Sequence, residues 1–379
     1  MNFDLNATQA LSLKLFKEFA EKEVQPIAAE IDEQERFPEE TVAKMAEIGM
    51  MGIPFPIEEG GSGGDTLTYV MAVEELSRHC GTTGVILSAH TSLACNPIHS
   101  FGTEEQKEKY LIPLANGSKL GAFGLTEPNA GSDSAMQQTV AVNEGNHYRV
   151  NGSKIFITNG GYADLFIIFA MTDKSKGTRG ISAFILEKGT EGFTIGKTEH
   201  KLGIKGSSTT ELIFKDVLVS KENLLGQEGK GFKIAMNTLD GGRIGIAAQA
   251  LGIAQGALDE AVKYTKERTQ FGRSISSFQN SQFKIAELQT KIDAARLLTY
   301  RAACLKDKGA PFTTEAAMAK LYASDIAMES TRESIQLLGG YGYTREYPVE
   351  RMYRDAKITE IYEGTSEVQK MVIAGSILK

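Results

Sequence analysis

Hydrophobic residues in the first third of the chain recur every three or four positions, which is the spacing of an amphipathic helix. Two pairs of residues, Asn6 with Gln9 and Thr103 with Gln106, have the spacing of a capping box, in which each side chain bonds the other residue's backbone N–H at a helix start. We therefore predict a helical domain over residues 1–120.

Between residues 121 and 230 the pattern changes to short runs rich in β-branched and aromatic residues. In order, these runs are GAFGL, QTVAV, HYRVNG, KIFIT, LFIIFAM, ISAFIL, FTIGK, ELIF and VLV. Turn residues such as Asn143–Asn146 separate them, at intervals typical of a sandwich or a barrel. We predict an antiparallel β-barrel domain over residues 121–230.

Helical spacing returns from residue 231 onward. Seven apolar side chains at intervals of three or four form one continuous stripe: Ile285, Leu288, Ile292, Ala295, Leu298, Ala302 and Leu305. Long helices with such a stripe pack as a bundle. We predict a C-terminal four-helix bundle over residues 231–379, so that the α+β chain runs helical, β, helical.

The composition excludes several classes of function. The chain has 41 basic and 48 acidic residues, a net charge of -7, and no block of like charge long enough to follow a nucleic-acid backbone. Cys80, Cys95 and Cys304 form neither a CxxC pair nor a disulfide framework, so we expect buried thiols in a reducing compartment. The five histidines lack zinc-binding spacing, and no metal site is predicted.

The first residues have neither the basic start and apolar core of a signal peptide nor the arginine-rich composition of a transit peptide. No uninterrupted apolar run approaches the length of a membrane span. We expect a soluble, cytoplasmic bacterial protein that binds neither nucleic acid nor membrane. A mitochondrial matrix protein trimmed of its presequence would look the same.

One candidate binding loop follows the first predicted strand. The segment Phe123–Asp133 runs from an apolar strand into small and hydroxyl residues. Such a loop exposes backbone N–H groups that suit a polar ring edge or a phosphate, but a solvated turn has the same composition. No GxGxxG follows a strand, which argues against a Rossmann dinucleotide site.

Five motifs occur together, in one order, along the chain: Phe123–Asp133 (FGLTEPNAGSD), Lys154–Asn159 (KIFITN), Glu267–Gly272 (ERTQFG), Gln336–Gly342 (QLLGGYG) and Tyr362–Glu367 (YEGTSE). Together they resemble the acyl-CoA dehydrogenase family, and the resemblance covers essentially all 379 residues. Within the family, Ser92–Ile98 and Lys119–Thr126 are most similar to the short-chain, butyryl-CoA branch of anaerobic bacteria.

The resemblance implies an FAD cofactor between the β domain and the C-terminal bundle. It assigns the isoalloxazine ring to a first set of residues: Phe123, Leu125, Thr126, Ser132, Phe156, Ile157 and Thr158. The pyrophosphate and adenosine fall to a second set, partly from a neighbouring subunit: Arg268, Phe271, Gln279, Gln336, Leu337, Leu338, Gly339 and Gly340. Three residues near the C-terminus complete the set: Thr365, Ser366 and Glu367. The family's flavin-covering aromatic is often tryptophan, whereas this chain has no tryptophan and places Phe156 there.

By the same resemblance, Glu363 is the catalytic base that removes the α-proton of an acyl-CoA thioester while the β-hydrogen leaves as hydride to flavin N5. The thioester oxygen then needs strong hydrogen bonds, which in the family come from the FAD ribityl 2′-hydroxyl and the base's own N–H. Without the resemblance, the favoured interpretation of Glu363 is a charge before a helix start marked by Ser366 and Gln369, and the resemblance reverses that preference. Some family branches carry the base at the position of Gly242, which cannot act as one here.

Substrate contacts are also implied by the resemblance, at Ser132, Asp240, Gly241, Gly242, Arg243 and Gly364. Asp240 and Arg243 could instead form a local ion pair on one helix. Residues 82–100, which correspond to a helix that lines the family's acyl pocket, contain no Lys, Arg, Asp or Glu. We therefore expect an apolar acyl tail rather than a dicarboxylic one.

The expected function is that of a short-chain acyl-CoA dehydrogenase that converts butyryl-CoA to crotonyl-CoA, assembles as a homotetramer and passes electrons to an electron-transferring flavoprotein. One alternative is an acyl-CoA oxidase, in which oxygen reoxidises the flavin, although oxidases of this type usually carry a further C-terminal domain. Another is a relative that binds flavin or acyl-CoA without catalysis and serves as an assembly factor.

Overall fold

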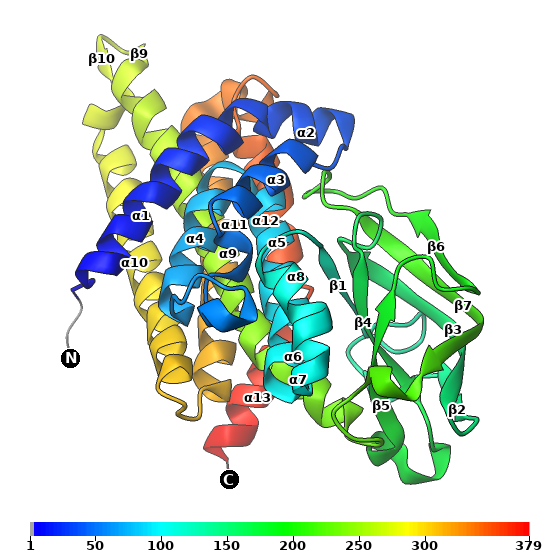
Figure 1. Ribbon diagram of the computed structural model, residues 1–379. Helices are drawn as coiled ribbons and strands as arrows, with labels where there is room; N and C mark the ends of the chain where they lie inside the picture. The colour runs from blue at the N-terminus through cyan, green and yellow to red at the C-terminus, as the bar shows by residue number, and fades with distance from the viewer. Residues whose placement is uncertain (1–3, 379) are drawn as a thin grey trace.

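The computed structural model describes residues 4–378, and its elements follow the predicted order of helices, strands and helices (Figure 1). The N-terminal part contains eight α-helices: α1 (Ala7–Phe19), α2 (Ala28–Gln34), α3 (Glu39–Glu47), α4 (Thr66–His79), α5 (Gly81–Ser88), α6 (Asn96–Phe101), α7 (Glu104–Gln106) and α8 (Ile112–Ala115). Three π-helical segments interrupt them: η1 (Ala20–Val24), η5 (Ala89–Cys95) and η6 (Lys107–Leu111). Both predicted capping boxes are present, at the starts of α1 and α7.

The middle part is a mainly antiparallel sheet of eight strands: β1 (Gly121–Gly124), β2 (Val140–Asn143), β3 (His147–Thr158), β4 (Leu165–Met171), β5 (Ile181–Glu187), β6 (Phe193–Thr198), β7 (Thr209–Ser220) and β8 (Leu224–Leu225). The strand order is β6-β7-β3-β2-β4-β5-β8, with β1 beside β4. The prediction of a purely antiparallel sheet was wrong, because β4 pairs in parallel with both β1 and β2. Long connections separate these strands along the chain, as parallel neighbours require.

Two pairs of predicted short runs are each one long strand. HYRVNG and KIFIT join as β3, and ELIF and VLV join as β7. Gly152 (φ 145°) and Asp216 (φ 53°) sit at the joins, where the β3–β7 register shifts. The backbone breaks the alternation of side chains there without ending the strand, so the sequence pattern suggests two strands.

The C-terminal part contains five α-helices and one small hairpin: α9 (Gly231–Glu267), α10 (Gln279–Asp307), α11 (Thr313–Leu338), α12 (Val349–Thr359), α13 (Ser366–Ile377), β9 (Thr269–Gln270) and β10 (Arg273–Ser274). The predicted apolar stripe of α10 faces the helical core, where Leu288, Ile292 and Ala295 are buried. The central helix α9 packs against α4, α10, α11 and α12. Two of its glycines allow close approach to α4, because a Cβ on Gly252 or Gly256 would lie 2.2 Å or 2.0 Å from an α4 carbonyl oxygen.

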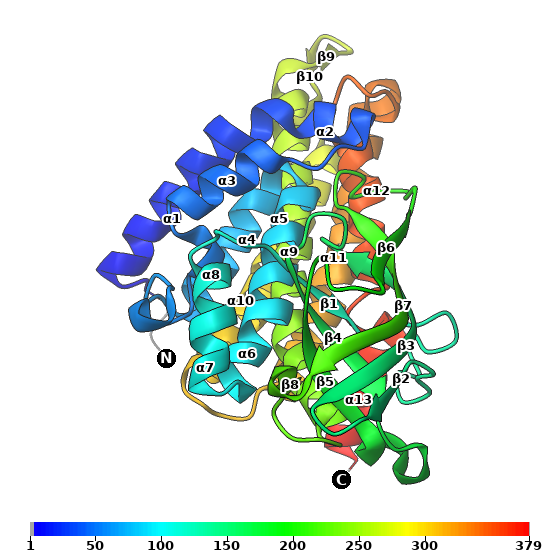
Figure 2. The ribbon, with the colours of Figure 1, turned by 45° about the vertical axis from the view of Figure 1, so that its right-hand side comes forward.

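Sheet and helices meet along β1, β4 and β5, as Figure 2 shows from a second direction. Strand β4 is buried on both faces: Ile167 and Phe169 pack in a cluster with residues of α6, α8 and α9, while Phe166 and Ile168 lie in the core within the sheet. This junction places the ends of β1 and β3 beside α9 and the turn before α13. None of the helices within residues 4–378 combines the length and apolar character that crossing a membrane requires.

Candidate active site at the junction of helices and sheet

A cavity of about 190 Å³ lies at this junction. It is lined by the whole predicted ring-binding set and by three other predicted residues: Phe123, Leu125, Thr126, Ser132, Phe156, Ile157, Thr158, Arg243, Glu363 and Gly364. Ala89 and Leu93 of η5 line it as well, in agreement with the expectation that residues 82–100 contribute an apolar wall. The structure therefore brings strand ends, a bundle helix and the YEGTSE motif to one place.

Glu363 lies in the turn between α12 and α13, at a left-handed φ of 55°, followed by Gly364 at 87°. Its side-chain Oε2 is buried and, among residues 4–378, accepts no hydrogen bond. A buried polar atom without a partner costs free energy and is rare in folded proteins. An unpaired carboxylate oxygen on a residue that lines a cavity suits a reactive base.

Burial raises the pKa of Glu363 to about 7, while the charges of Arg243 and Lys320 oppose that rise. A base whose pKa is close to neutral is ionised for a large part of the time yet remains strong enough to accept a proton. Perturbation of this kind in a cavity is characteristic of functional carboxylates. The alternative of a mere helix-end charge does not account for the buried, unpartnered Oε2 and the raised pKa of Glu363.

Gly242 touches the predicted base. A Cβ at this position would lie 2.8 Å from Glu363 Oε2 and 2.9 Å from Leu93 Cδ2. Any side chain here would displace the carboxylate or the η5 wall. The glycine that cannot itself act as a base thus leaves the space that Glu363 occupies.

Asp240 and Arg243 form the ion pair that their spacing on α9 allowed, with Asp240 Oδ1 and Arg243 Nη1 2.6 Å apart. Thr313 Oγ1 donates to the other oxygen of Asp240 at 2.7 Å. Burial raises the pKa of Asp240, against the influence of Thr313 and Arg243. Arg243 lines the cavity, whereas Asp240 and Gly241 do not, so a substrate contact at these two residues stays a prediction.

The cavity's loop beside β1 is held by a buried ion pair that the sequence did not single out. Lys154 Nζ donates to Glu127 Oε1 (2.7 Å), to Gln137 Oε1 (3.1 Å) and to the carbonyl oxygen of Leu125 (3.2 Å). Lys154 is 0% and Glu127 4% exposed. The lysine begins the KIFITN motif, but nothing in that motif indicates whether its charge is buried.

Several predicted cofactor-binding residues lie away from this cavity. Arg268, Phe271 and Gln279 belong to the β9–β10 hairpin region and the start of α10, and Phe271 is 94% exposed. At the end of α11, Gln336, Gly339 and Gly340 are exposed, Leu337 is half-buried and Leu338 is buried. The structure brings none of these residues to Glu363, and their contact with a cofactor stays a prediction.

The predicted start of the last helix is wrong by one residue. The N-cap of α13 is Thr365, whose side chain accepts a hydrogen bond from the N–H of Val368, and Ser366 is the first helical residue. Gln369 does not complete a capping box, because its side chain donates to the carbonyl oxygens of Glu363 and Gly364. Thr365, Ser366 and Glu367 do not line the cavity.

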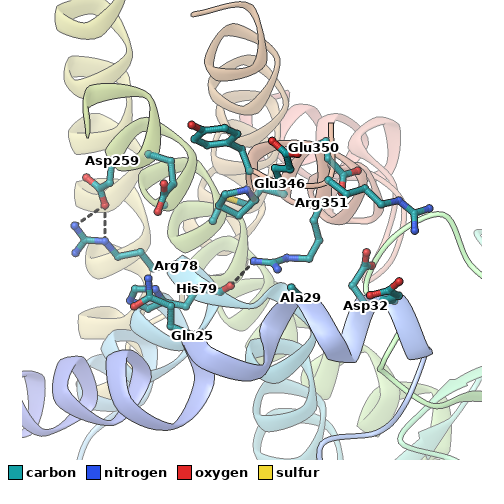
Figure 3. Close-up of a pocket in the computed structure, with 16 residues that line it drawn as sticks. Gln25, Ala29, Asp32, Arg78, His79, Asp259, Glu346, Glu350 and Arg351 are labelled. Atoms are coloured by element: carbon teal, nitrogen blue, oxygen red, sulfur yellow. Dashed lines mark hydrogen bonds and ion pairs between the residues drawn. The ribbon is translucent and has the colours of Figure 1, made fainter. Parts of the chain in front are cut away.

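A second cavity, of about 300 Å³, lies between α2, the end of α4, α9 and α12 (Figure 3). Its charged side chains largely bond to the protein itself: Arg78 pairs with Asp259, and Arg351 donates to the carbonyl oxygen of His79. It contains none of the predicted site residues. Within residues 4–378 no group of three or more His, Cys, Asp or Glu could hold a metal ion.

Known proteins match the whole length of this fold. Residues 6–118, 122–217 and 229–378 match the family models described as the N-terminal, middle and C-terminal domains of acyl-CoA dehydrogenase. The relative "Acyl-CoA dehydrogenase, short-chain specific" from Clostridium acetobutylicum is 66% identical over 379 residues, which is 100% of both chains. The chain belongs to the acyl-CoA dehydrogenase family.

Solved structures of the family agree with this membership. The butyryl-CoA dehydrogenase of Megasphaera elsdenii is 56% identical, with a TM-score of 0.99 and 100% of both chains covered. A chain of the structure described as "Electron transferring flavoprotein of Acidaminococcus fermentans: Towards a mechanism of flavin-based electron bifurcation" is 58% identical, with the same TM-score and coverage. The family resemblance indicated by the five motifs, and the order helical, β, helical, are therefore confirmed.

Proposed function

We propose that this chain is an FAD-dependent acyl-CoA dehydrogenase of short-chain substrates, converting butyryl-CoA to crotonyl-CoA with Glu363 as the base. The observation that carries the proposal is the buried, unpartnered Oε2 of Glu363 in a cavity lined by the ring-binding set. The names of the C. acetobutylicum relative and of the M. elsdenii structure support a substrate with a short acyl chain.

The cavity suits a flavin ring. Phe156 is held at a left-handed φ of 58° with its side chain 59% exposed, so it offers an open aromatic face beside Leu125 and Ile157. The hydroxyl groups of Thr126 and Thr158 line the same space and could bond the polar ring edge. When bound, FAD supplies the acceptor for the substrate's β-hydride.

The protein's own part is to bind, orient and deprotonate the substrate. The Glu363 carboxylate takes the α-proton, and desolvation by the bound acyl chain strengthens it as a base. The Glu363 N–H makes no hydrogen bond within residues 4–378, which leaves it free to donate to the thioester oxygen as negative charge develops there. Ala89 and Leu93 give the acyl tail an apolar wall without charges.

The same proposal includes three domains, at residues 1–120, 121–230 and 231–379. In it the middle sheet closes into a barrel, the C-terminal domain is a four-helix bundle, and the protein assembles as a cytoplasmic homotetramer. The pyrophosphate and adenosine parts of FAD would then be bound, partly across a subunit contact, by Arg268, Phe271, Gln279 and Gln336–Gly340. The A. fermentans structure supports an electron-transferring flavoprotein as the electron acceptor.

Anaerobic bleaching of the bound flavin by acyl-CoAs of increasing chain length tests the function. We expect fastest reduction with butyryl-CoA, little with a dicarboxylic acyl-CoA, and crotonyl-CoA as the product. Flavin that stays oxidised with every acyl-CoA would reject the proposal in favour of a non-catalytic binder. Hydrogen peroxide released in air at the rate of butyryl-CoA turnover would identify an oxidase instead.

A further inference from the structure

Lys320, on α11, is a fully buried lysine whose ammonium group reaches the turn that carries Glu363. The residue is 0% exposed, and its Nζ donates to the carbonyl oxygen of Gly364 at 2.8 Å. An ammonium group taken out of water is unfavourable unless hydrogen bonds and an opposite charge compensate it.

The turn is clamped from two sides. Gln369 Nε2 donates to the carbonyl oxygens of Glu363 (3.1 Å) and Gly364 (2.8 Å), so Lys320 and Gln369 together occupy both carbonyls. Glu363 has a left-handed φ, which is strained for a residue with a side chain and persists only where the surroundings fix it. With these carbonyls held, the peptide planes between Glu363 and Gly364 and between Gly364 and Thr365 are fixed.

Lys320 is also one of two cations whose charges act on the Glu363 carboxylate. The other is Arg243 of α9, which already pairs with Asp240 at 2.6 Å. Lys320 itself makes no ion pair with a carboxylate within residues 4–378, since Gly364 is its hydrogen-bond partner. The charged groups that act on it are Glu363, Arg243, Glu360 and Asp325. Tyr69 of α4 and Tyr362 are further titratable groups near Glu363.

We propose that Lys320 is a positioning residue for the reaction at Glu363: it fixes the Glu363–Gly364 turn through the Gly364 carbonyl and its charge keeps the neighbouring carboxylate ionised. The inference deepens the proposed function and rests on it, because it assigns a helper to the proposed base. Lys320 does not line the cavity, so it acts through Glu363 rather than on the substrate.

Two substitutions separate the two roles. Lys320→Gln can still donate to the Gly364 carbonyl but carries no charge, whereas Lys320→Met loses both. We expect the apparent pKa of Glu363 to rise by about one unit in both variants, because an opposite charge lowers the pKa of a carboxylate. The rate of flavin reduction at high pH should stay near the original value in Lys320→Gln and fall at least tenfold in Lys320→Met.

Two measurements test whether the charge of Lys320 sets the ionisation of Glu363. The first is the pH profile of single-turnover flavin reduction by butyryl-CoA. The second needs no turnover: an infrared titration of the holoenzyme without substrate, in which the band of the protonated Glu363 carboxyl is assigned by its loss in Glu363→Gln. Arg301→Gln, which removes a surface cation that pairs with Glu315 of α11, is the matched control and should leave both readouts unchanged.

An unchanged Glu363 pKa in folded, flavin-containing Lys320→Gln would overturn the proposal, and Lys320→Met need not fold for that result. If the original protein fails to reduce its flavin with any acyl-CoA, the proposed function falls. The infrared titration would still show whether Lys320 sets the ionisation of Glu363.

Discussion

Two buried lysines each hold a backbone carbonyl at the edge of the same cavity, but their surroundings differ. Lys154 bonds three acceptors, and its partner Glu127 also accepts from the N–H groups of Gln138 and Thr139. Both charged groups of that ion pair are therefore hydrogen-bonded. Lys320 bonds the Gly364 carbonyl, and the carboxylate that its charge acts on keeps an oxygen without a partner.

The difference distinguishes a structural ion pair from a carboxylate that can react. Around Lys154 the charges neutralise each other, and burial lowers its pKa to about 8 against the attraction of Glu127. An ion pair with both charges hydrogen-bonded can only fix the shape of the loop that bears Leu125. Glu363 Oε2, in contrast, has no hydrogen-bond partner within residues 4–378. The protonation of this carboxylate can therefore still change when a substrate enters.

The largest expected effect comes from breaking the Lys154–Glu127 ion pair. Lys154→Met leaves the Glu127 charge buried without its cation, which should cost about 3–5 kcal/mol in the free energy of unfolding. Urea denaturation of the purified holoenzyme measures this loss, and FAD retention should fall with it. Lys109→Met, at an exposed pair with Glu187, is the control and should change stability by less than about 1 kcal/mol. Equal losses in the two variants would refute the interpretation that the buried Lys154–Glu127 pair holds this region.

Gly242→Ala disturbs the open region without changing any charge. Its Cβ would overlap Glu363 Oε2 and Leu93 Cδ2, so the carboxylate must move. A displacement of about 1 Å at a reacting group can slow a reaction about 100-fold, and we expect a loss of that size in the rate of flavin reduction. Gly375→Ala, on α13 and outside the cavity lining, is the matched control, because a Cβ there has nothing within 4 Å. An unaffected rate in Gly242→Ala would mean that Glu363 reacts from another position.

The rate of the proposed reaction at Glu363 should depend on pH. The base must be ionised to act, so the rate should rise with pH and level off above the Glu363 pKa of about 7. Below that pH the rate should fall about tenfold for each unit, as for a single required carboxylate. A pH profile of flavin reduction from pH 5 to 9 checks this. A rate that is constant down to pH 5 would contradict the raised pKa.

The smallest effect is expected at the helix that follows the base. Thr365→Ala removes the N-cap of α13 and should cost about 1 kcal/mol of stability. Ser366→Ala should cost less, because the Ser366 hydroxyl caps nothing and makes no hydrogen bond among residues 4–378. Thermal unfolding of both variants compares them, and a larger loss in Ser366→Ala would restore the predicted cap.

The helical and β parts and the location of Glu363 could be predicted because each depends on local periodicity or on a contiguous motif. The start of α13 was missed by one residue since Thr365 and Ser366 are both good caps, and only the backbone decides between them. Strands β3 and β7 each looked like two because Gly152 and Asp216 interrupt their side-chain alternation.

Lys320 could not be assigned from sequence for a different reason. Its partner turn lies on a later element of the chain, and a helix-to-turn contact leaves no local pattern. The available signal is weak: the lysine lies among Ala316, Ala317, Ala319 and Ala323, which are all buried. A charged residue in such an apolar stretch of helix indicates burial but not its partner.

The central claim is that Glu363 removes the substrate's α-proton, and deuterium exchange tests it most directly. Butyryl-CoA is incubated anaerobically in heavy water with the FAD-loaded protein or with its Glu363→Gln variant, and the label at the α-carbon is followed by mass spectrometry. We predict rapid incorporation with the original protein and none above background with the variant, which should still bind FAD and butyryl-CoA. Incorporation at equal rates in both would show that another group takes the proton.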